Sequence, residues 1–385
     1  MQRKENVVEQ RVSFAAVGDI MLEQGLSRLI EKRGPEFPFL RVASELQSAD
    51  IVFGNLEAPL TTRQEKVVWD FSKYGWTGKA KPIFLKGSPI AAIGLKNAGF
   101  DVVSIANNHV LDYGMKGLME TVDVLQTNGI VPVGFGLNAR EATSPTLLEV
   151  KGLQVAFLAA SFAYEATFFS PGVAPIGLWT LRRAVKKTRA LSDIVVVSLH
   201  TGTEFKDSPS TSTIKLARSL VEAGANMVLC HHPHVLQSVE AYKKGVIAYS
   251  LGNFVFDYDS FRNRALARGQ TEETIEKSRQ TIILKCMLAK HGVVDYSILP
   301  IQLNSDCQPT AVPRGSELHQ EIVEKVNAPL LPRFSSSSNK RSIRGRKEMS
   351  DALNGLVISL RRMDLKNLYI LLRKVADRVH VHLVH

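Results

Sequence analysis

Cysteine is scarce in this chain, and long hydrophobic runs are missing. The 385 residues include three cysteines, Cys230, Cys286 and Cys307, which are odd in number and far apart in the sequence. No disulfide framework is therefore indicated, and a reducing compartment fits the composition. No apolar run approaches the roughly 18 residues that a membrane-spanning helix needs, so we expect no transmembrane segment.

The amino terminus also lacks the features of a secretory signal. Residues 1–6 are polar and lead directly into the first expected strand, without an apolar core or a small-residue cleavage site. We therefore expect a cytoplasmic protein. Peripheral contact with a membrane is the alternative, because the carboxy-terminal region is basic.

Basic residues outnumber acidic ones, with 48 Lys and Arg against 37 Asp and Glu, for a formal net charge of +11. Such an excess favours polyanionic partners, among them acidic polymers, phosphoesters and nucleic acid. Much of it lies in the carboxy-terminal tail, and no zinc finger, RNP motif or Gly-rich KH loop accompanies it, so nucleic acid is not the expected partner. Residues 61–87 keep that alternative open, because aromatic residues there are interleaved with lysines. These aromatics are Trp69, Phe71, Tyr74 and Trp76.

Apolar runs and helical periods alternate from residue 12 to residue 305. Short apolar runs predict buried strands, and apolar residues repeated every three or four positions predict the helices between them. This alternation is typical of a layered α/β domain. Helices are expected over residues 40–47, 90–98, 115–128, 178–190 and 213–223, a hairpin over 280–288 and 293–299, and long loops over 61–87, 162–177 and 257–273.

The character of the sequence changes after residue 305. Residues 306–347 include four consecutive serines followed by a basic run, and are predicted to form a flexible linker. Residues 348–385 carry apolar side chains at helical spacing with Arg and Lys on the other face, which predicts an amphipathic helix. Such a helix is expected to dock on the domain; self-association or contact with an anionic membrane surface are the alternatives.

Five apolar runs end in residues that commonly bind metals. The runs cover residues 14–17, 51–53, 102–105, 194–197 and 227–229. They are followed by Gly18-Asp19, Asn55-Leu56-Glu57, Asn107-Asn108-His109, His200 and His231-His232-Pro233-His234. Because the carboxyl ends of parallel strands meet at one crevice, these five signals predict a single site.

The mixture of carboxylate, carboxamide and imidazole side chains differs from the cysteine-rich sets of structural zinc sites. It favours a hydrolytic centre with two divalent ions, Mn, Fe or Zn, roughly 3.5–4 Å apart. The candidate ligands are Asp19, Asn55, Glu57, Asn108, His200, His232 and His234, with Asp19 and His109 as catalytic candidates. Asn107, Glu204, His231 and Asn253 are candidates for binding substrate or for orienting the ligands.

The order of these motifs resembles the CapA family. The resemblance covers residues 13–260 and includes Gly18-Asp19, Asn55-Leu56-Glu57, Ala106-Asn107-Asn108-His109, Asp112-Tyr113-Gly114, His200, His231-His232-Pro233-His234-Val235 and Tyr249-Ser250-Leu251-Gly252-Asn253-Phe254. CapA proteins act in capsule or poly-γ-glutamate synthesis and are similar to calcineurin-like metallophosphatases. The resemblance implies a four-layer α/β/β/α sandwich with a two-metal site at its edge, here with a carboxy-terminal helical extension.

By that likeness, Asp19 and His234 belong to one metal, while Asn108, His200 and His232 belong to the other. His109 is the acid.

Two departures from the metallophosphatase pattern leave two functions open. The superfamily's first motif is Asp-x-His, where this chain has Asp19-Ile20-Met21, and a thioether is a poor ligand for a hard cation. The bridging aspartate is replaced by Asn55, with Glu57 two residues on. The first hypothesis is a metal-dependent hydrolase that acts on phosphoesters or γ-glutamyl amide bonds. The alternative is a non-catalytic component of a capsule or polyglutamate synthesis complex that binds the acidic polymer.

Overall fold

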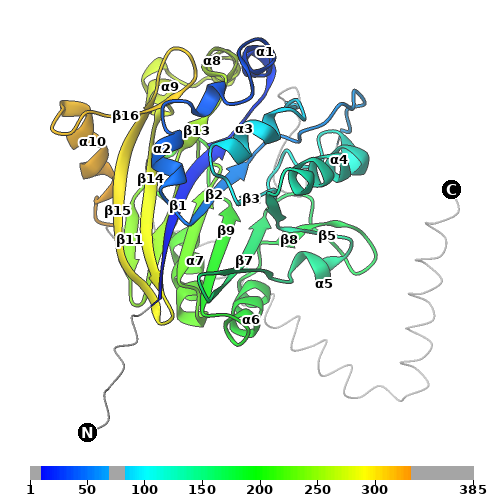
Figure 1. Ribbon diagram of the computed structural model, residues 1–385, viewed down its shortest axis with the longest axis vertical. Helices are drawn as coiled ribbons and strands as arrows, with labels where there is room; N and C mark the ends of the chain where they lie inside the picture. Colours follow the sequence, from blue (N-terminus) through cyan, green and yellow to red (C-terminus); the bar gives the residue numbers. More distant parts are fainter. Residues whose placement is uncertain (1–9, 69–82, 331–385) are drawn as a thin grey trace, which may run out of the picture. The chain divides into compact units, whose positions relative to one another are not determined.

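The computed structural model describes residues 10–68 and 83–330, whose strands form two eight-stranded sheets (Figure 1). The first sheet has the order β16 (Pro309–Ala311), β15 (Gly292–Leu303), β14 (Gln280–Ala289), β1 (Arg11–Ile20), β2 (Ile51–Leu56), β3 (Val102–Ser104) and β4 (Val131–Val133), with β13 (Asn253–Val255) beside β1. The second has the order β11 (Val239–Tyr242), β12 (Gly245–Ala248), β10 (Met227–His231), β9 (Ile194–His200), β7 (Leu153–Ser161), β8 (Gly172–Pro175) and β5 (Phe135–Gly136), with β6 (Thr146–Val150) beside β7.

The two sheets pack face to face through a shared hydrophobic core. Phe14 of β1 and Phe53 of β2 place their rings 6.3 and 6.0 Å from the ring of Phe157 of β7. All three side chains are almost completely buried. Burial of such aromatic surface is a main source of stability, so these rings hold the sheets together.

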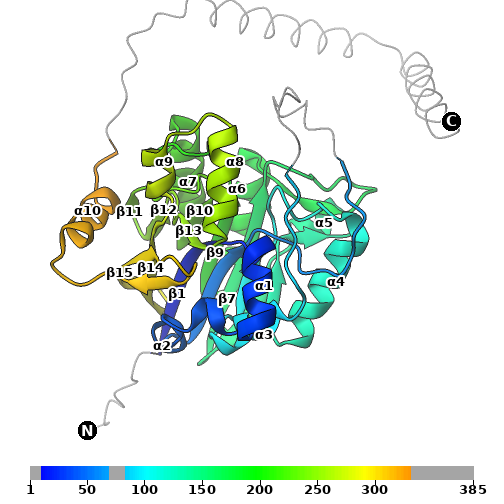
Figure 2. The same ribbon diagram turned by 90° about the horizontal axis from the view of Figure 1, so that it is seen from above.

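Helices cover the outer faces of both sheets (Figure 2). On the side of the first sheet lie α1 (Gln24–Arg33), η1 (Phe37–Phe39), α2 (Ala43–Gln47), α3 (Ala91–Asn97) and α4 (Gly114–Thr127). On the side of the second, α6 (Leu178–Arg189) packs on β9, and α7 (Thr211–Ala223) packs on β10 and β12. The remaining helices are α5 (Ala139–Ala142), α8 (Tyr258–Ala267), α9 (Glu272–Lys277) and α10 (Glu317–Val326). The predicted four-layer α/β/β/α sandwich is confirmed.

Helix α7 illustrates why these segments fold as they do. Its buried residues Thr213, Ala217, Leu220 and Val221 follow the helical period, which gives one apolar face for the sheet. The Ser210 side chain accepts a hydrogen bond from the Thr213 amide and caps the amino terminus. The helix ends at Gly224, whose φ of 119° is readily adopted only by glycine.

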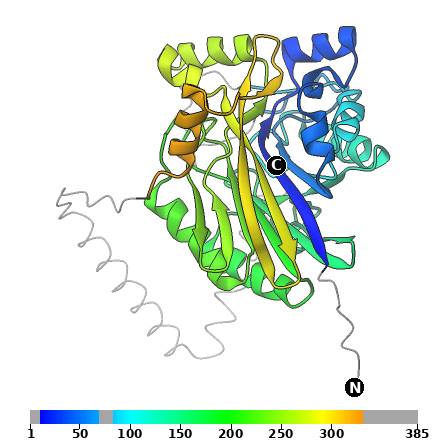
Figure 3. The same ribbon diagram turned by 60° about the vertical axis from the view of Figure 1, so that its left-hand side comes forward.

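The predicted hairpin over 280–288 and 293–299 is confirmed as β14 and β15, of which β14 pairs with β1 (Figure 3). Three other predictions were wrong. Residues 162–177, expected to be a loop, contain β8 near their end. Residues 257–273, expected to be a loop, hold α8 and the start of α9. The start of the predicted linker over 306–347 instead holds β16, which pairs with β15, and α10; the first compact unit of the chain extends to Pro329.

Two sequence predictions lie outside the described residues. The aromatic residues of the loop, Trp69, Phe71, Tyr74 and Trp76, belong to 69–82, and the amphipathic helix expected over 348–385 belongs to 331–385. Among the residues that are described, the helices are too short or too polar to cross a membrane.

Candidate metal centre

Strand ends from both sheets meet at one site. Asp19 of β1 lies beside Asn55 of β2 in the first sheet, and His200 of β9 lies beside His231 of β10 in the second. Each of these pairs is parallel, so all four residues lie at carboxyl ends. The sequence argument of a single crevice therefore holds, but the crevice is formed by two sheets.

Glycine at position 18 allows β1 to approach β13. A Cβ atom at residue 18 would lie 2.0 Å from the carbonyl oxygen of Gly252, which no side chain could tolerate. The close approach lets the Asp19 amide donate a 2.9 Å hydrogen bond to that oxygen. The Gly18-Asp19 motif thus fixes the carboxylate of Asp19 within the crevice.

Asp19 is held by protein groups on both carboxylate oxygens. Asn55 Nδ2 donates a 2.8 Å hydrogen bond to Oδ1, and His231 Nδ1 lies 3.3 Å from the same oxygen. His234 Nδ1 lies 3.5 Å from Oδ2, and the His232 amide donates to Oδ2 at 3.3 Å. Complete burial opposes the charge, but the bonds with His231 and His234 outweigh it and hold the pKa of Asp19 well below its usual range.

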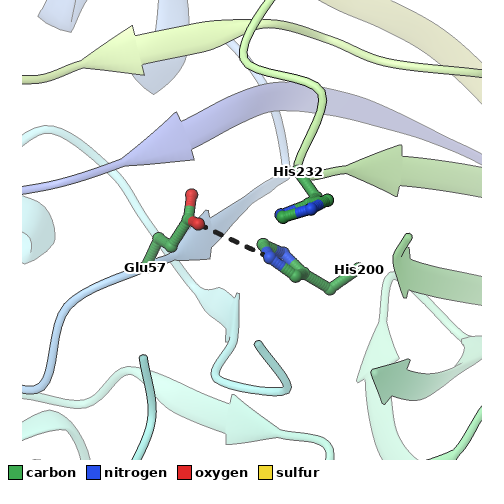
Figure 4. A group of neighbouring side chains, drawn as sticks. All are labelled: Glu57, His200 and His232. Atoms are coloured by element: carbon green, nitrogen blue, oxygen red, sulfur yellow. Dashed lines mark ion pairs between the residues drawn. The ribbon is translucent and has the colours of Figure 1, made fainter. Parts of the chain in front are cut away.

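Glu57 has no hydrogen-bond donor for either carboxylate oxygen among the described residues. Its Oε1 lies 3.4 Å from His200 Nε2 and 3.8 Å from His234 Nε2 (Figure 4 shows the first of these pairs). Burial, followed by repulsion from Asp19, raises the pKa of Glu57 well above its usual range. This carboxylate faces imidazoles but is not satisfied by them.

Three overlapping groups of side chains could each hold a metal ion. They are Asp19, Glu57 and His234; Glu57, His200 and His232; and Glu204, His232 and His234. Within each group the potential ligand atoms lie within 4.8 Å of one another. Glu57 belongs to the first two groups, which gives it the position of a carboxylate shared between two sites.

The imidazoles of His232 and His234 differ in charge. Burial, which outweighs the nearby Glu204, lowers the pKa of His232 to about 4. Burial also opposes the charge of His234, but Glu57 and Asp19 raise its pKa to about 10. A neutral imidazole such as that of His232 is the form that binds metals.

The backbone around Pro233 is held in an uncommon conformation. His232 and His234 have φ angles of 97° and 59°, in the region that non-glycine residues seldom adopt. Their rings lie 5.8 Å apart, so both point into the site. Backbone strain of this kind concentrates at functional sites. His231 is 1% exposed and its Nδ1 lies 3.3 Å from Asp19 Oδ1, so it contacts a candidate ligand; its role in orienting that ligand stays a prediction.

The amide side chains join the two halves of the site. Asn108 Oδ1 lies 2.6 Å from His200 Nε2, and Asn55 Nδ2 lies 3.3 Å from His200 Nδ1. Asn107 Nδ2 donates to the Leu56 carbonyl oxygen at 2.8 Å. Asn253 Oδ1 lies 2.9 Å from His234 Nδ1. The structure therefore brings all the predicted asparagines to the cluster.

His109 is paired with an acidic residue that the sequence analysis did not assign to the site. Its Nδ1 lies 2.8 Å from Asp112 Oδ2, which also accepts a 2.7 Å hydrogen bond from the Leu85 amide. The His109 amide donates to Asn107 Oδ1. A carboxylate on Nδ1 fixes the tautomer and orientation of an imidazole, and the three-residue spacing of His109 and Asp112 was the available signal.

Met21 lies within an apolar cluster. It is 2% exposed and packs in one group with Ala58, Leu85 and Phe256. This environment favours the interpretation of Met21 as an apolar filler over that of a missing metal ligand.

A cavity of about 410 Å³ opens over the cluster. Glu57, Asn108, His109, His232 and His234 line its floor, and aromatic residues contribute to its walls. Glu204 borders it and pairs with Arg268 at 3.3 Å. Arg264 of α8 and Arg268, which follows its last residue, also line the cavity. The sequence did not point to them, because it predicts a loop over residues 257–273.

Comparison with known proteins assigns the family. The model of the family described as "Bacterial capsule synthesis protein PGA_cap" matches residues 13–258. The chain belongs to this family. The predicted relationship to CapA proteins is thereby confirmed.

Two CapA proteins are among its relatives. The "Capsule biosynthesis protein CapA" of Bacillus anthracis is 34% identical over 256 residues, which are 64% of this chain and 60% of that protein. The "PGA biosynthesis protein CapA" of Bacillus subtilis is 29% identical over 320 residues, which are 82% of this chain and 77% of that protein. The match therefore spans less than two thirds of the Bacillus anthracis protein.

Solved phosphatases are also similar to this chain. A novel phosphatase from Mycoplasma pneumoniae gives a TM-score of 0.46 at 15% identity and covers 77% of this chain and 95% of its own. A calcineurin-like phosphoesterase of Bacillus subtilis gives a TM-score of 0.41 at 14% identity and covers 82% of this chain and 96% of its own.

Proposed function

We propose that this protein is a metal-dependent hydrolase that acts in capsule or poly-γ-glutamate biosynthesis, on phosphoester or γ-glutamyl amide bonds. The proposal places Mn, Fe or Zn ions in two positions that share Glu57. Asp19 and His234 complete one position, and His200 and His232 complete the other, next to Asn108.

The observation that carries the proposal is the unsatisfied carboxylate of Glu57. A buried carboxylate without hydrogen bonds costs several kcal/mol unless a cation compensates it. The surrounding residues are imidazoles and a second carboxylate, which are the ligand types that Mn, Fe and Zn accept. His232 Nδ1 is also buried without a partner among the described residues. The donor set therefore fits a divalent metal.

A bound divalent metal would supply a water-derived nucleophile at neutral pH and withdraw charge from the scissile group. His109 would hold the proton for the leaving group on Nε2, because Asp112 occupies Nδ1. The aromatic walls of the cavity, among them Phe162 and Phe205, would exclude bulk water from the reacting groups.

Metal analysis paired with a substrate screen tests this function. Protein purified without chelator should carry stoichiometric Mn, Fe or Zn by elemental analysis. It should hydrolyse p-nitrophenyl phosphate or a γ-glutamyl anilide, and Asp19→Ala should abolish that turnover. Absence of stoichiometric metal would contradict the proposal.

The second candidate is a non-catalytic component that binds the acidic polymer within a capsule or polyglutamate synthesis complex. It is supported by Met21 and Asn55, which replace residues of the metallophosphatase pattern. Metal-loaded protein that binds the polymer without turnover would favour it. We propose a cytoplasmic location, with peripheral membrane contact through the basic carboxy-terminal region as the alternative; fractionation of cells that express the full chain would separate the two.

A further inference from the structure

Two arginines line the cavity in addition to the candidate metal ligands. Arg264 lies in α8 and Arg268 caps its carboxyl end, so they are one helical turn apart on the same side of the helix. A guanidinium is always charged, and its planar fork matches carboxylate and phosphate groups. The cavity thus combines a candidate metal centre with a pair of permanent cations.

A hydrogen bond connects the residue before helix α8 to α1. Asp257 caps its amino terminus through Ser260, and its Oδ2 also accepts a 2.8 Å hydrogen bond from the Gly25 amide. A Cβ atom at residue 25 would lie 2.6 Å from that oxygen, so the contact requires the glycine. The arginines therefore project from a capped helix whose start is anchored to α1, which favours a preformed binding site.

Only one of the two terminal nitrogens of Arg264 is hydrogen-bonded to Glu23. Its Nη2 donates to Oε1 of the buried Glu23 at 2.5 Å, whereas Nη1 is buried without a hydrogen-bond partner among the described residues. Glu23 Oε2 likewise has none, so the pair is not the two-pronged contact that arginine and carboxylate usually form. Burial raises the pKa of Glu23 despite the neighbouring arginine. One guanidinium nitrogen thus has no partner among the described residues, and the Arg264 side chain, which is 21% exposed, lines the cavity.

Arg268 connects this region to the metal cluster. Its Nη1 lies 3.3 Å from Glu204 Oε2, and Glu204 in turn forms one of the candidate metal groups with His232 and His234. The Arg268 side chain is 30% exposed, so a ligand in the cavity can reach it. A molecule bound at the metal cluster would therefore extend toward both arginines.

We propose that Arg264 and Arg268 form an oxyanion subsite that holds a second acidic group of the substrate, apart from the group at the metal cluster. This inference rests on the proposed function and narrows the substrate class to molecules with an anionic group next to the scissile one. The cavity of about 410 Å³ is within the range of ligand sites and has room for more than the reacting group. The anion is a carboxylate or a phosphate, since both match the guanidinium fork.

Titration calorimetry on the metal-free full chain tests the subsite without relying on turnover. The probes are γ-linked triglutamate, the same peptide with its carboxylates converted to amides, and inorganic phosphate. The variants are Arg268→Gln and Arg264→Lys, which keeps the charge beside Glu23 but removes the second guanidinium nitrogen. Arg262→Gln is the matched control, because Arg262 lies on the same helix, pairs with Glu272 and does not line the cavity.

We expect the wild-type chain to bind triglutamate or phosphate, and each cavity variant to bind that anion roughly tenfold more weakly. Arg262→Gln should bind within about twofold of wild type, and the amidated peptide should bind weakly to all variants. Binding of triglutamate alone assigns the subsite to carboxylates, and binding of phosphate alone assigns it to phosphates. Wild-type-like affinity in both cavity variants, or no anion binding by the wild type, would overturn the inference. If the wild type binds the anion as expected but takes up no divalent metal in a separate titration, the subsite stands and only the proposed function is refuted.

Discussion

Asp19 and Glu57 are both completely buried carboxylates of the same cluster, yet their surroundings differ. Asp19 receives hydrogen bonds from Asn55 and the His232 backbone and has imidazoles beside both oxygens. Glu57 receives no hydrogen bond from the described residues and has a raised pKa. The protein alone stabilises the charge of Asp19, whereas the charge of Glu57 requires a further cation. Asp19 therefore already has partners within the protein, whereas Glu57 is the carboxylate that has the greater need of a cation.

Replacement of His109 should have the largest effect on turnover. Like Asp19, His109 has a partner within the protein, because its Nδ1 lies beside Asp112 Oδ2. If His109 is the proton donor and not a ligand, His109→Ala should lower turnover by roughly 10²–10⁴. Metal content, measured by elemental analysis, should stay at the wild-type level. Loss of metal in this variant would show that His109 is a metal ligand and not the proton donor.

Replacement of Asp19 and of Glu57 in the metal-free protein should change its stability by different amounts. Asp19→Asn removes a buried charge that its partners depend on and should lower the free energy of unfolding by about 3–5 kcal/mol. Glu57→Gln should change it much less, because neither carboxylate oxygen of Glu57 accepts a hydrogen bond from the described residues and burial disfavours its charged form. Urea denaturation measures both. Equal losses of stability would contradict the claim that the protein stabilises the carboxylate of Asp19 more than that of Glu57.

The free energy of unfolding of the metal-free protein should depend on pH through the titration of His232. Its folded pKa of about 4 lies below the usual value of 6.5, so the unfolded chain binds more protons between these two values. His232 therefore costs stability as the pH falls through that window, by about 3 kcal/mol at its lower end. His232→Gln should flatten the urea-derived stability profile between about pH 6.5 and 4. An unchanged profile would remove His232 as the cause.

Met21→His should have the smallest effect of this series. Since Met21 packs with Ala58, Leu85 and Phe256, a histidine there would bury an unsatisfied polar group and cost about 1–3 kcal/mol. Metal affinity should not change. Thermal melts and metal titration decide the matter: a higher affinity would mean that the site has a vacant ligand position at residue 21.

Much of the site could be predicted because its signals are local. Each candidate ligand lies within five residues after an apolar run, and apolar runs predict buried strands whichever strands they pair with. Asp19, His200 and His232 were found in this way. The contacts of Glu57 could not be predicted, because they depend on how the turn after β2 faces His200 of β9 and His234, which follows β10.

The missed residues have a common cause. Helix α8 has a weak apolar face, with Phe261 and Ala265 as its buried residues, so its period did not stand out in the sequence. Tertiary contacts, such as the bond from Gly25 to Asp257, fix it instead. The sequence consequently predicts a loop at Arg264 and Arg268, and it does not show that both line the cavity beside the candidate metal ligands.

Calorimetric titration of Mn²⁺ and Zn²⁺ into wild type and Glu57→Gln tests the central claim most directly. His231→Ala is the control, since His231 contacts Asp19 from behind and is not among the groups that could hold a metal. We predict that wild type binds the metal, that Glu57→Gln lowers the affinity by at least roughly 100-fold, and that His231→Ala lowers it less. Equal affinities of wild type and Glu57→Gln would contradict the assignment of Glu57 as the shared ligand.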